Sequence, residues 1–413
     1  MVDNGSTPLL LLVGSGNQRY REYILSALAG AYRLWLLDTA EPTWQEQYLV
    51  GATCTEINDA RAIADASREL AATAGSPHGL LCYDEFLVPS AAAAADLLDL
   101  PGPRPEAIAA CRDKAATRRV LRAAGVPQPR SIPVATPEEA AAAAAEIGYP
   151  VVLKARAQAG SLGVIRVDEA AGVEAAFTAA ASASWHGVKN PHPPVLVEDY
   201  LDGPEISVDS AVTAEGAEML VVARKQIGLD PYFEEVGHVV DASDPLLSDP
   251  ELQELLTLVH ETLGLAYAAT HSEFRLTPLG PRLVEVNPRL GGDLIPYLGL
   301  LAGGVDCARA AAEVALGRAP RVRRGLPRAA GIRFLYPPYD CRVNGITVRD
   351  RLSPAIVEAT ITAKPGQLLQ LPPRAYLSRY GYVIAVADTP AEVQKALEAP
   401  EEILVLDAQS VAA

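Results

Sequence analysis

Short apolar runs alternate with glycine turns and helical stretches over residues 1–100. An apolar run at 8–13 ends in a Gly-Ser-Gly turn at 14–16, and a helical stretch leads to a second run at 32–37. Residues 80–83 continue the pattern as another buried strand. This order of strand, turn, helix and strand predicts an α/β layer. The turn lacks the third glycine of a dinucleotide-binding fingerprint, which favours a tight turn over nucleotide binding.

A proline-rich stretch at 101–105 separates this layer from a second, smaller unit. The strands of that unit at 150–155 and 164–167 are expected to pair across the glycine loop between them. Its predicted elements are helices at 113–124, 140–146 and 170–183 and strands at 150–155, 164–167 and 195–200.

A third region starts near residue 205 with a hairpin and ends in a strand-rich tail. Two further strands, turned by Thr-Pro-Leu-Gly, are expected to pair with each other. The predicted strands are 206–212, 219–223, 271–276, 282–287, 331–335, 356–362, 382–387 and 402–406, and the helices are 249–264, 305–316 and 391–397.

The fold class predicted from these patterns is α/β, with α+β character in the tail. We expect an N-terminal α/β domain over 1–110, a central small domain over 111–204 and a large C-terminal domain over 205–413. The strand-rich tail of the last domain begins near residue 330. No internal repeat of fixed period is present in the sequence.

Charge and cysteine usage narrow the classes of function. The formal net charge of −16 argues against general binding to nucleic acid or to an anionic membrane. The five cysteines are scattered and odd in number, so a zinc site or a disulfide framework is not expected and a cytoplasmic location fits. No apolar run reaches membrane length. Only six lysines occur, so a lysine within an apolar strand merits attention.

Polar residues at alternate positions end the apolar strand at 282–287. Glu285, Asn287 and Arg289 share one face because successive strand residues point to opposite faces. Three polar groups on one side of a buried strand are costly unless a charged ligand lies there. Carboxylate and amide oxygens suit Mg²⁺, and a guanidinium suits an adjacent phosphate or carboxylate. This face therefore predicts a magnesium and phosphate site.

Other candidates are ambiguous when each is taken alone. Lys154 ends an apolar strand and is followed by a glycine loop at 158–163, which suits phosphate but also suits a plain hairpin with a snorkelling lysine. Lys114 reads as a surface lysine on a helix. The strand end at 198–201 can offer backbone groups to an adenine edge, and Glu205 can accept ribose hydroxyls, although an acidic strand end is the simpler interpretation.

Taken in order, these pieces resemble the ATP-grasp ligases over about residues 100–320. The resemblance implies an ATP-grasp fold preceded by a Rossmann-like pre-ATP-grasp domain. It implies that Lys114, Lys154 and the loop residues Gly160, Ser161 and Gly163 hold ATP phosphates, with Lys225 as a third lysine contact. It also implies an adenine site at Glu198, Tyr200 and Leu201 and a ribose contact at Glu205.

The resemblance further implies two magnesium ions, with Mn²⁺ able to substitute. Glu273 and Glu285 would bind them, Glu285 bridging both ions and Asn287 holding the second. The residues support this independently, because the strand carrying Glu273 is the one expected to pair with 282–287. That pairing would bring the two carboxylates together, and carboxylates so close need a cation or a shared proton.

Within this superfamily, the segments 233–239 and 289–293 and the tail after Gly331 are similar to the L-amino acid ligases that make dipeptides, including carnosine-synthase-like enzymes. This resemblance implies that Glu235, His238 and Arg289 lie at the amino acid site. Arg289 would stabilise the oxyanion, Glu235 would hold a substrate ammonium, and His238 would orient or deprotonate the incoming amine. A loop histidine with a local hydrogen bond is the alternative for His238, and His271 is expected to be structural.

The implied activity is ATP-dependent joining of two amino acids through an acyl phosphate, with either an α- or a γ-linked amide as product. The partners are then amino acids of unspecified identity, bound as small-molecule substrates, and a homodimer is left open. The alternatives are another ATP-grasp carboxylate–amine or thiol ligase or a carboxylase component, a non-catalytic nucleotide-binding module, and a dehydrogenase built on the N-terminal layer. The intact set of expected metal ligands disfavours the non-catalytic module.

Overall fold

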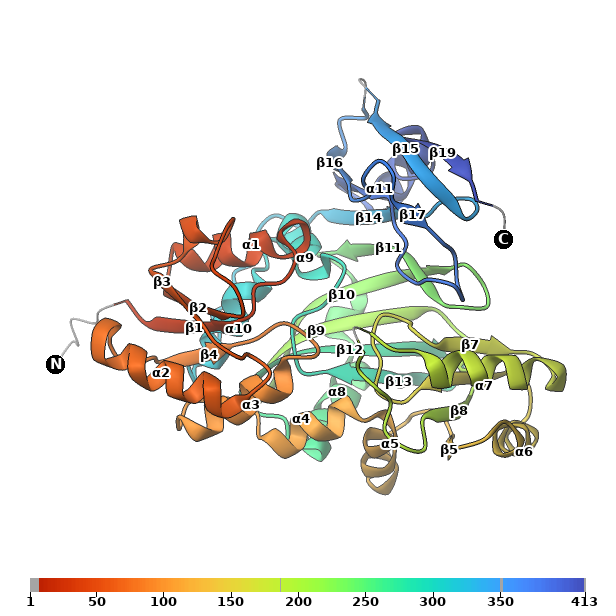
Figure 1. The fold of residues 1–413 in the computed structure, drawn as a ribbon, viewed down its shortest axis with the longest axis horizontal. Coiled ribbons are helices and arrows are strands. Elements are labelled where there is room, and N and C mark those ends of the chain that lie inside the picture. Colours follow the sequence, from red (N-terminus) through yellow and green to blue (C-terminus); the bar gives the residue numbers. More distant parts are fainter. Residues whose placement is uncertain (1–6, 186, 350–351, 412–413) are drawn as a thin grey trace.

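The computed structural model describes residues 7–185, 187–349 and 352–411. Three α/β bodies surround a long central sheet (Figure 1). The N-terminal layer and the small sheet lie toward opposite ends of the molecule. A separate small sheet of the C-terminal tail lies above the central sheet in this view. No helix among the described residues is long and apolar enough to cross a membrane.

The N-terminal layer is a parallel sheet in the order β3-β2-β1-β4. All residues of β1 are buried, as expected for a parallel strand covered on both faces. The strands are β1 (Leu9–Val13), β2 (Arg33–Asp38), β3 (Gly51–Cys54) and β4 (Gly79–Leu81), and the helices are α1 (Gln18–Ala29), α2 (Ala60–Ala74) and α3 (Val88–Leu97). The sequence patterns therefore predicted this layer but missed β3, α2 and α3.

Two helices, α4 (Pro105–Arg112) and α5 (Lys114–Ala123), connect this layer to the small domain. The Asp113 side chain caps α5 by accepting hydrogen bonds from the backbone N–H groups of Ala115 and Ala116. A second anchor comes from Arg156, whose guanidinium donates to both carboxylate oxygens of Asp113 at 2.6 Å. The first turn of α5, which carries Lys114, is thereby fixed against the small sheet.

The small domain is an antiparallel sheet in the order β5-β8-β6-β7. Leu153 lies opposite Ile165, which confirms the expected pairing across the glycine loop. Its strands are β5 (Ser131–Val134), β6 (Val151–Ala155), β7 (Val164–Val167) and β8 (Val195–Asp199), packed by α6 (Pro137–Ile147) and α7 (Val173–Ser182). The helix expected over 170–183 is split into a 3₁₀ turn at Ala170–Gly172 and α7.

The central sheet is antiparallel and runs β13-β12-β9-β10-β11-β14-β18-β16. It continues without a break from the strands of residues 205–287 into the strand-rich tail, because β11 pairs with β14. The strands are β9 (Glu205–Thr213), β10 (Gly216–Gly228), β11 (Glu234–Asp241), β12 (Ala268–Thr277), β13 (Gly280–Asn287), β14 (Ala329–Leu335), β16 (Ile356–Ile361) and β18 (Gly381–Ala387).

Helices α8 (Pro250–Leu263), α9 (Ile295–Gly303) and α10 (Cys307–Ala315) pack against this sheet. The tail adds a second small sheet, β17-β15-β19, and helix α11. These elements are β15 (Cys341–Val348), β17 (Leu368–Leu369), β19 (Leu404–Ser410) and α11 (Pro390–Ala396), and further 3₁₀ turns occur at Glu46–Tyr48, Pro245–Ser248 and Pro400–Glu402. The sequence patterns missed α9, β11, β15 and β17.

Candidate functional site

A cavity of about 1220 Å³, including its open mouth, lies between the small sheet and the central sheet. It receives side chains from α5, from the glycine loop, from β8, and from the strands β9 to β13. The predicted site residues that line it are Lys114, Lys154, Gly160, Ser161, Glu198, Tyr200, Leu201, Glu205, Lys225, Glu235, Glu273, Glu285, Asn287 and Arg289. Gly163 and His238 are the two predicted residues that do not line it.

The two expected metal-binding carboxylates lie opposite each other. Glu273 on β12 pairs in register with Glu285 on β13, and Asn287 pairs with His271 two positions further along. Burial alone would raise the pKa of Glu273, but Lys225 and His271 lower it to about 2. The carboxylates of Glu273 and Glu285, beside the amide oxygen of Asn287, form a hard oxygen donor set of the kind that Mg²⁺ prefers.

Lys225 on β10 is the buried cation at the centre of this acidic group. Its Nζ lies 2.9 Å from Glu205 Oε1, 2.9 Å from Glu235 Oε1 and 3.0 Å from Glu273 Oε2. Burial alone would lower the pKa of Lys225, but the three carboxylates raise it well above its ordinary value. Lys225 therefore connects three carboxylates to which the sequence analysis gave different roles. These are Glu205, the predicted ribose contact, Glu235, predicted to hold a substrate ammonium, and Glu273, a predicted metal ligand.

A second buried network joins the small sheet to α5. Glu198 on β8 is in ion-pair contact with Lys154 Nζ at 2.6 Å and with Arg118 Nε at 2.7 Å. Burial lowers the pKa of Lys154 to about 8, although Glu198 opposes this shift. Burial alone would raise the pKa of Glu198, but Arg118 and Lys154 lower it to about 2.

Arg118 is a site residue that the sequence patterns missed. Its Nη2 also donates to the carbonyl of Val284 at 2.6 Å, so it connects α5 and β8 to the metal-site strand. A signal was present in the sequence, because Arg118 lies four residues after Lys114 and so on the same face of the helix.

The glycine loop between β6 and β7 has the backbone shape expected of a phosphate-binding loop. Gly160, Ser161 and Gly163 all have positive φ, at 62°, 59° and 74°. A Cβ at Gly163 would lie 2.6 Å from the Cβ of Ala183, so this glycine permits close packing outside the cavity. The Ser161 hydroxyl donates to the carbonyl of Phe233 at 2.8 Å and thereby holds the loop against the central sheet.

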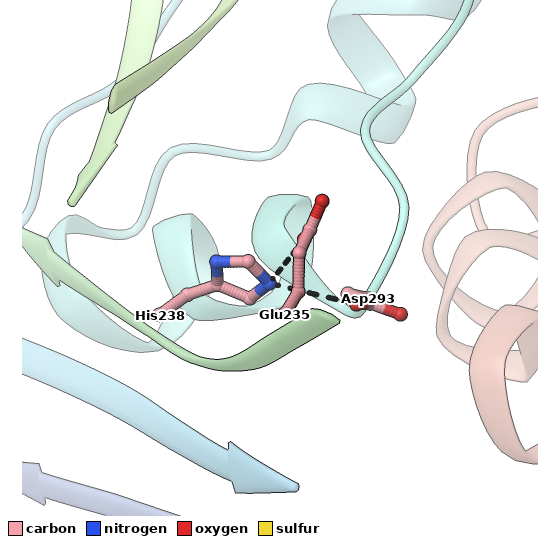
Figure 2. Close-up of side chains that lie close together, drawn as sticks. All are labelled: Glu235, His238 and Asp293. Atoms are coloured by element: carbon pink, nitrogen blue, oxygen red, sulfur yellow. Dashed lines mark ion pairs between the residues drawn. The ribbon is translucent and has the colours of Figure 1, made fainter. Parts of the chain in front are cut away.

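Glu235, His238 and Asp293 form a compact group at the cavity wall, which Glu235 and Asp293 line (Figure 2). His238 is fully buried, and its Nε2 lies 3.1 Å from Glu235 Oε2 and 3.6 Å from Asp293 Oδ2. Burial alone would lower the pKa of His238, but the two carboxylates raise it. Glu235 lines the cavity and His238 does not. The ring therefore contacts the Glu235 carboxylate from the side away from the cavity and orients it.

Arg289 follows β13 and is held by a carboxylate from the N-terminal layer. Its Nε is in ion-pair contact with Glu85 Oε2, and the other oxygen of Glu85 contacts Arg112. Burial alone would raise the pKa of Glu85, but the two guanidinium groups lower it. Glu85 lies just after β4, and no local pattern in the sequence pointed to it.

His271, which the sequence analysis expected to be structural, lies beside the predicted metal ligand Glu273. It lines the cavity, with Nδ1 2.6 Å from Asp209 Oδ1 and Nε2 3.5 Å from Glu273 Oε1. Burial alone would lower the pKa of His271, but Asp209 and Glu273 raise it to about 9. The ring is therefore charged at neutral pH and holds Glu273 in place.

Comparisons with known families match this architecture. An ATP-grasp domain model matches residues 147–297, and a second ATP-grasp domain model matches residues 109–184. The model of L-amino acid ligase C-terminal domain 2 matches residues 333–402. The chain belongs to the ATP-grasp superfamily and carries an L-amino acid ligase C-terminal domain. The fold predicted for this ATP-grasp protein from its sequence is thereby confirmed.

Solved structures of other proteins resemble this chain over nearly its whole length. The L-amino acid ligase from Bacillus licheniformis is 19% identical with a TM-score of 0.78, over 98% of this chain and 100% of that chain. Phosphoribosylglycinamide synthetase from Anaerococcus prevotii is 15% identical with a TM-score of 0.71, over 98% of this chain and 100% of that chain. The biotin carboxylase domain of Hydrogenobacter thermophilus 2-oxoglutarate carboxylase, solved with MgADP, is 19% identical with a TM-score of 0.69, over 98% of this chain and 92% of that chain. At these identities the likeness is one of fold.

A nearer sequence relative is the uncharacterised protein y4rH from Sinorhizobium fredii. It is 34% identical to this ATP-grasp protein over 309 residues, which is 73% of this chain. The chain spans 63% of the length of that relative.

Proposed function

We propose that the protein is an ATP- and magnesium-dependent ligase that joins two amino acids through an acyl phosphate and releases ADP and phosphate. One observation carries the proposal. The facing pair Glu273 and Glu285 shares a single cavity with Lys114, Lys154 and Arg289, beneath a C-terminal domain of the L-amino acid ligase type. A carboxylate activated by phosphoryl transfer needs a cation site, phosphate-binding lysines and a fixed cation for the developing negative charge.

Glu273, Glu285 and Asn287 are suited to hold Mg²⁺, because they offer oxygen donors on paired strands and Glu273 stays ionised at neutral pH. Magnesium would supply neutralisation of phosphate charge during phosphoryl transfer. Lys114 lies 3.2 Å from Glu285 and so can contact the same phosphate groups.

In the first half of the proposed reaction, a carboxylate oxygen of one amino acid attacks the γ-phosphorus of ATP, and ADP leaves. Lys114 and Lys154 hold the phosphates, and the loop that contains Gly160 and Ser161 covers them from water, which would hydrolyse an acyl phosphate. Arg289 stands at the carboxylate end, where Glu85 fixes the direction of its guanidinium.

In the second half, the amine of another amino acid attacks the acyl carbon, loses a proton and expels phosphate. Glu235 is the carboxylate placed to hold a substrate ammonium, and His238 orients it from behind. Arg289 meets the charge that develops on the carbonyl oxygen of the tetrahedral intermediate. We assign His238 a positioning role rather than direct proton abstraction, because its ring is fully buried and outside the cavity lining.

Phosphate release with ATP, magnesium and pairs drawn from the standard amino acids tests the proposal, with product masses read for each active pair. A ligase of this class is expected to release phosphate only when suitable amino acids are present and to yield a product with the mass of a dipeptide. Phosphate release that depends on bicarbonate, or on an amine or thiol that is not an amino acid, would favour another ATP-grasp chemistry. No nucleotide turnover under any pairing would contradict the proposal.

The pH dependence of ATP binding offers a separate prediction for Lys154. Its ammonium contacts phosphate only while protonated, and the pKa of the buried lysine is about 8 in the structure. Because phosphate stabilises the protonated form, ATP binding should raise this pKa, and KM for ATP is expected to rise as pH increases above 8. Lys154→Arg keeps its charge over this range, so its KM profile should be flatter. Equal slopes for the two proteins would remove Lys154 from phosphate binding.

A further inference from the structure

A short segment of the C-terminal domain, Tyr376 to Arg379, reaches the cavity from outside the ATP-grasp strands. It lies between β17 and β18 and inside the part that matches the L-amino acid ligase C-terminal domain. Leu377 from this segment lines the cavity. The place where a Cβ of Gly160 would be is 3.2 Å from Leu377 Cδ1, so the segment also touches the glycine loop.

Arg379 anchors this segment through nearly all of its donor groups. Its two terminal nitrogens donate to the two oxygens of Asp293 at 2.7 and 2.8 Å, and one of them also donates to the carbonyl of Glu235 at 2.9 Å. Its Nε donates to the Tyr336 hydroxyl at 2.8 Å, and its guanidinium lies 3.7 Å from the centre of the Phe334 ring. A buried arginine with this many directed contacts fixes the position of whatever it holds.

The residues held by Arg379 belong to the amino acid end of the cavity. Asp293 lines the cavity and has φ of 50°, and the next residue, Leu294, has φ of 62°. Two successive non-glycine residues in the left-handed region are strained, and they persist only where the surroundings hold them. The two-point contact from Arg379 to Asp293 is such a restraint.

Glu234 secures the same segment from the side of β11. It accepts a hydrogen bond from the backbone N–H of Leu377 at 3.1 Å and another from the Tyr336 hydroxyl at 2.7 Å. Glu234 is itself fully buried and precedes Glu235, the predicted ammonium contact. The C-terminal domain is thus hydrogen-bonded to Asp293 and the Glu235 carbonyl, which belong to the group shown in Figure 2, and to the neighbouring Glu234.

We propose that Arg379 is a positioning residue through which the C-terminal domain builds the amino acid subsite, by holding Asp293 and the backbone of Glu235. The inference rests on the proposed ligase function and adds to it a division of labour. The lysines and the glycine loop bind ATP, whereas the segment from Tyr376 to Arg379 shapes the place where an amino acid binds. Loss of Arg379 therefore weakens the binding of one amino acid and leaves ATP binding unchanged.

Kinetics of Arg379→Lys test this inference, because lysine keeps the charge but cannot make the two-point contact with Asp293. KM for one of the two amino acids is expected to rise roughly tenfold or more, as for the loss of a charged hydrogen bond. KM for ATP should stay within about twofold, which is less than the loss of such a hydrogen bond would cause. Asp293→Asn removes the same contact from the other side and should raise KM for the same amino acid. Because the two changes remove one interaction, the double variant should show less than the product of the two effects.

Arg374→Met is the matched control, since Arg374 precedes the same segment, is half exposed, and pairs with Asp340 away from the cavity. Its amino acid KM values should match those of the wild type. The inference is overturned if Arg379→Lys and Asp293→Asn both leave these values unchanged, or if they raise the KM values for ATP and amino acids together. A wild-type protein that joins no amino acid pair would refute the ligase function itself, and the inference with it.

Discussion

Glu285→Gln is expected to abolish magnesium-dependent turnover while leaving the fold intact. Glutamine keeps the shape of the side chain but removes its charge, so a divalent cation loses its strongest donor on β13. The rate should fall by roughly a hundredfold or more, the scale seen when one charge-stabilising group is removed from an active site. The fold should tolerate the change, because Lys114, which pairs with Glu285, also donates to the carbonyl of Gln158 at 2.7 Å.

The measurement is phosphate release as a function of magnesium concentration, together with ATP binding in the presence and absence of the ion. Glu218→Gln is the matched control, since Glu218 lies exposed on β10 of the same sheet and outside the cavity. The variant at 285 should need much more magnesium, or show no response to it, whereas the control should follow the wild-type curve. A wild-type magnesium response in Glu285→Gln would refute the metal assignment.

The part of the site that could be predicted from the sequence is the part built from local pairing. A hairpin with a short turn, Thr277 to Gly280, brings the strands of Glu273 and Glu285 together, and a shift of register next to Glu273 then sets it opposite Glu285. The pattern of apolar positions located both strands and so predicted that the two carboxylates lie near each other, but it did not predict the shift of register that sets them face to face. The lysine at the end of β6 and its glycine loop were found for the same reason.

Long-range contacts explain what the sequence patterns missed. Glu85 lies 204 positions before Arg289, and Arg379 lies 86 positions after Asp293, so no spacing rule connects either pair. β11 was missed because its sequence, Glu-Glu-Val-Gly-His-Val-Val-Asp, lacks the alternation of apolar and polar residues expected of a half-buried strand. His238 lies on the same strand, buried and outside the cavity lining. A sequence pattern cannot distinguish this position from one inside the cavity.

Arg289→Ala is expected to retain ATP binding and to lose amide formation. The guanidinium lines the cavity and pairs with Glu85 of the N-terminal layer, whereas Lys114 and Lys154, the predicted phosphate contacts, pair with Glu285 and Glu198. Removing it takes away the fixed positive charge for the carboxylate, the acyl phosphate and the oxyanion, and should lower amide formation by roughly a hundredfold to a thousandfold. Arg289→Lys should recover only part of this loss, because an ammonium cannot reproduce the planar fork.

Two assays separate these steps. Binding of a non-hydrolysable ATP analogue reports on the nucleotide site, and trapping of the acyl phosphate with hydroxylamine reports on the first half-reaction. Arg289→Ala should bind the analogue like the wild type and yield little hydroxamate or dipeptide. Normal dipeptide formation by this variant would remove Arg289 from the mechanism.

Glu85→Gln provides the graded companion to this variant. The change keeps a hydrogen-bond acceptor for Arg289 but removes the charge that orients it, so kcat should fall by less than in Arg289→Ala. The two residues are in direct contact, and the effect of Glu85→Gln should therefore largely disappear in the Arg289→Ala background. Independent effects in the double variant would instead mean that Glu85 acts through Arg112, its other partner. The comparison thus decides whether the N-terminal layer contributes to the chemistry through Arg289.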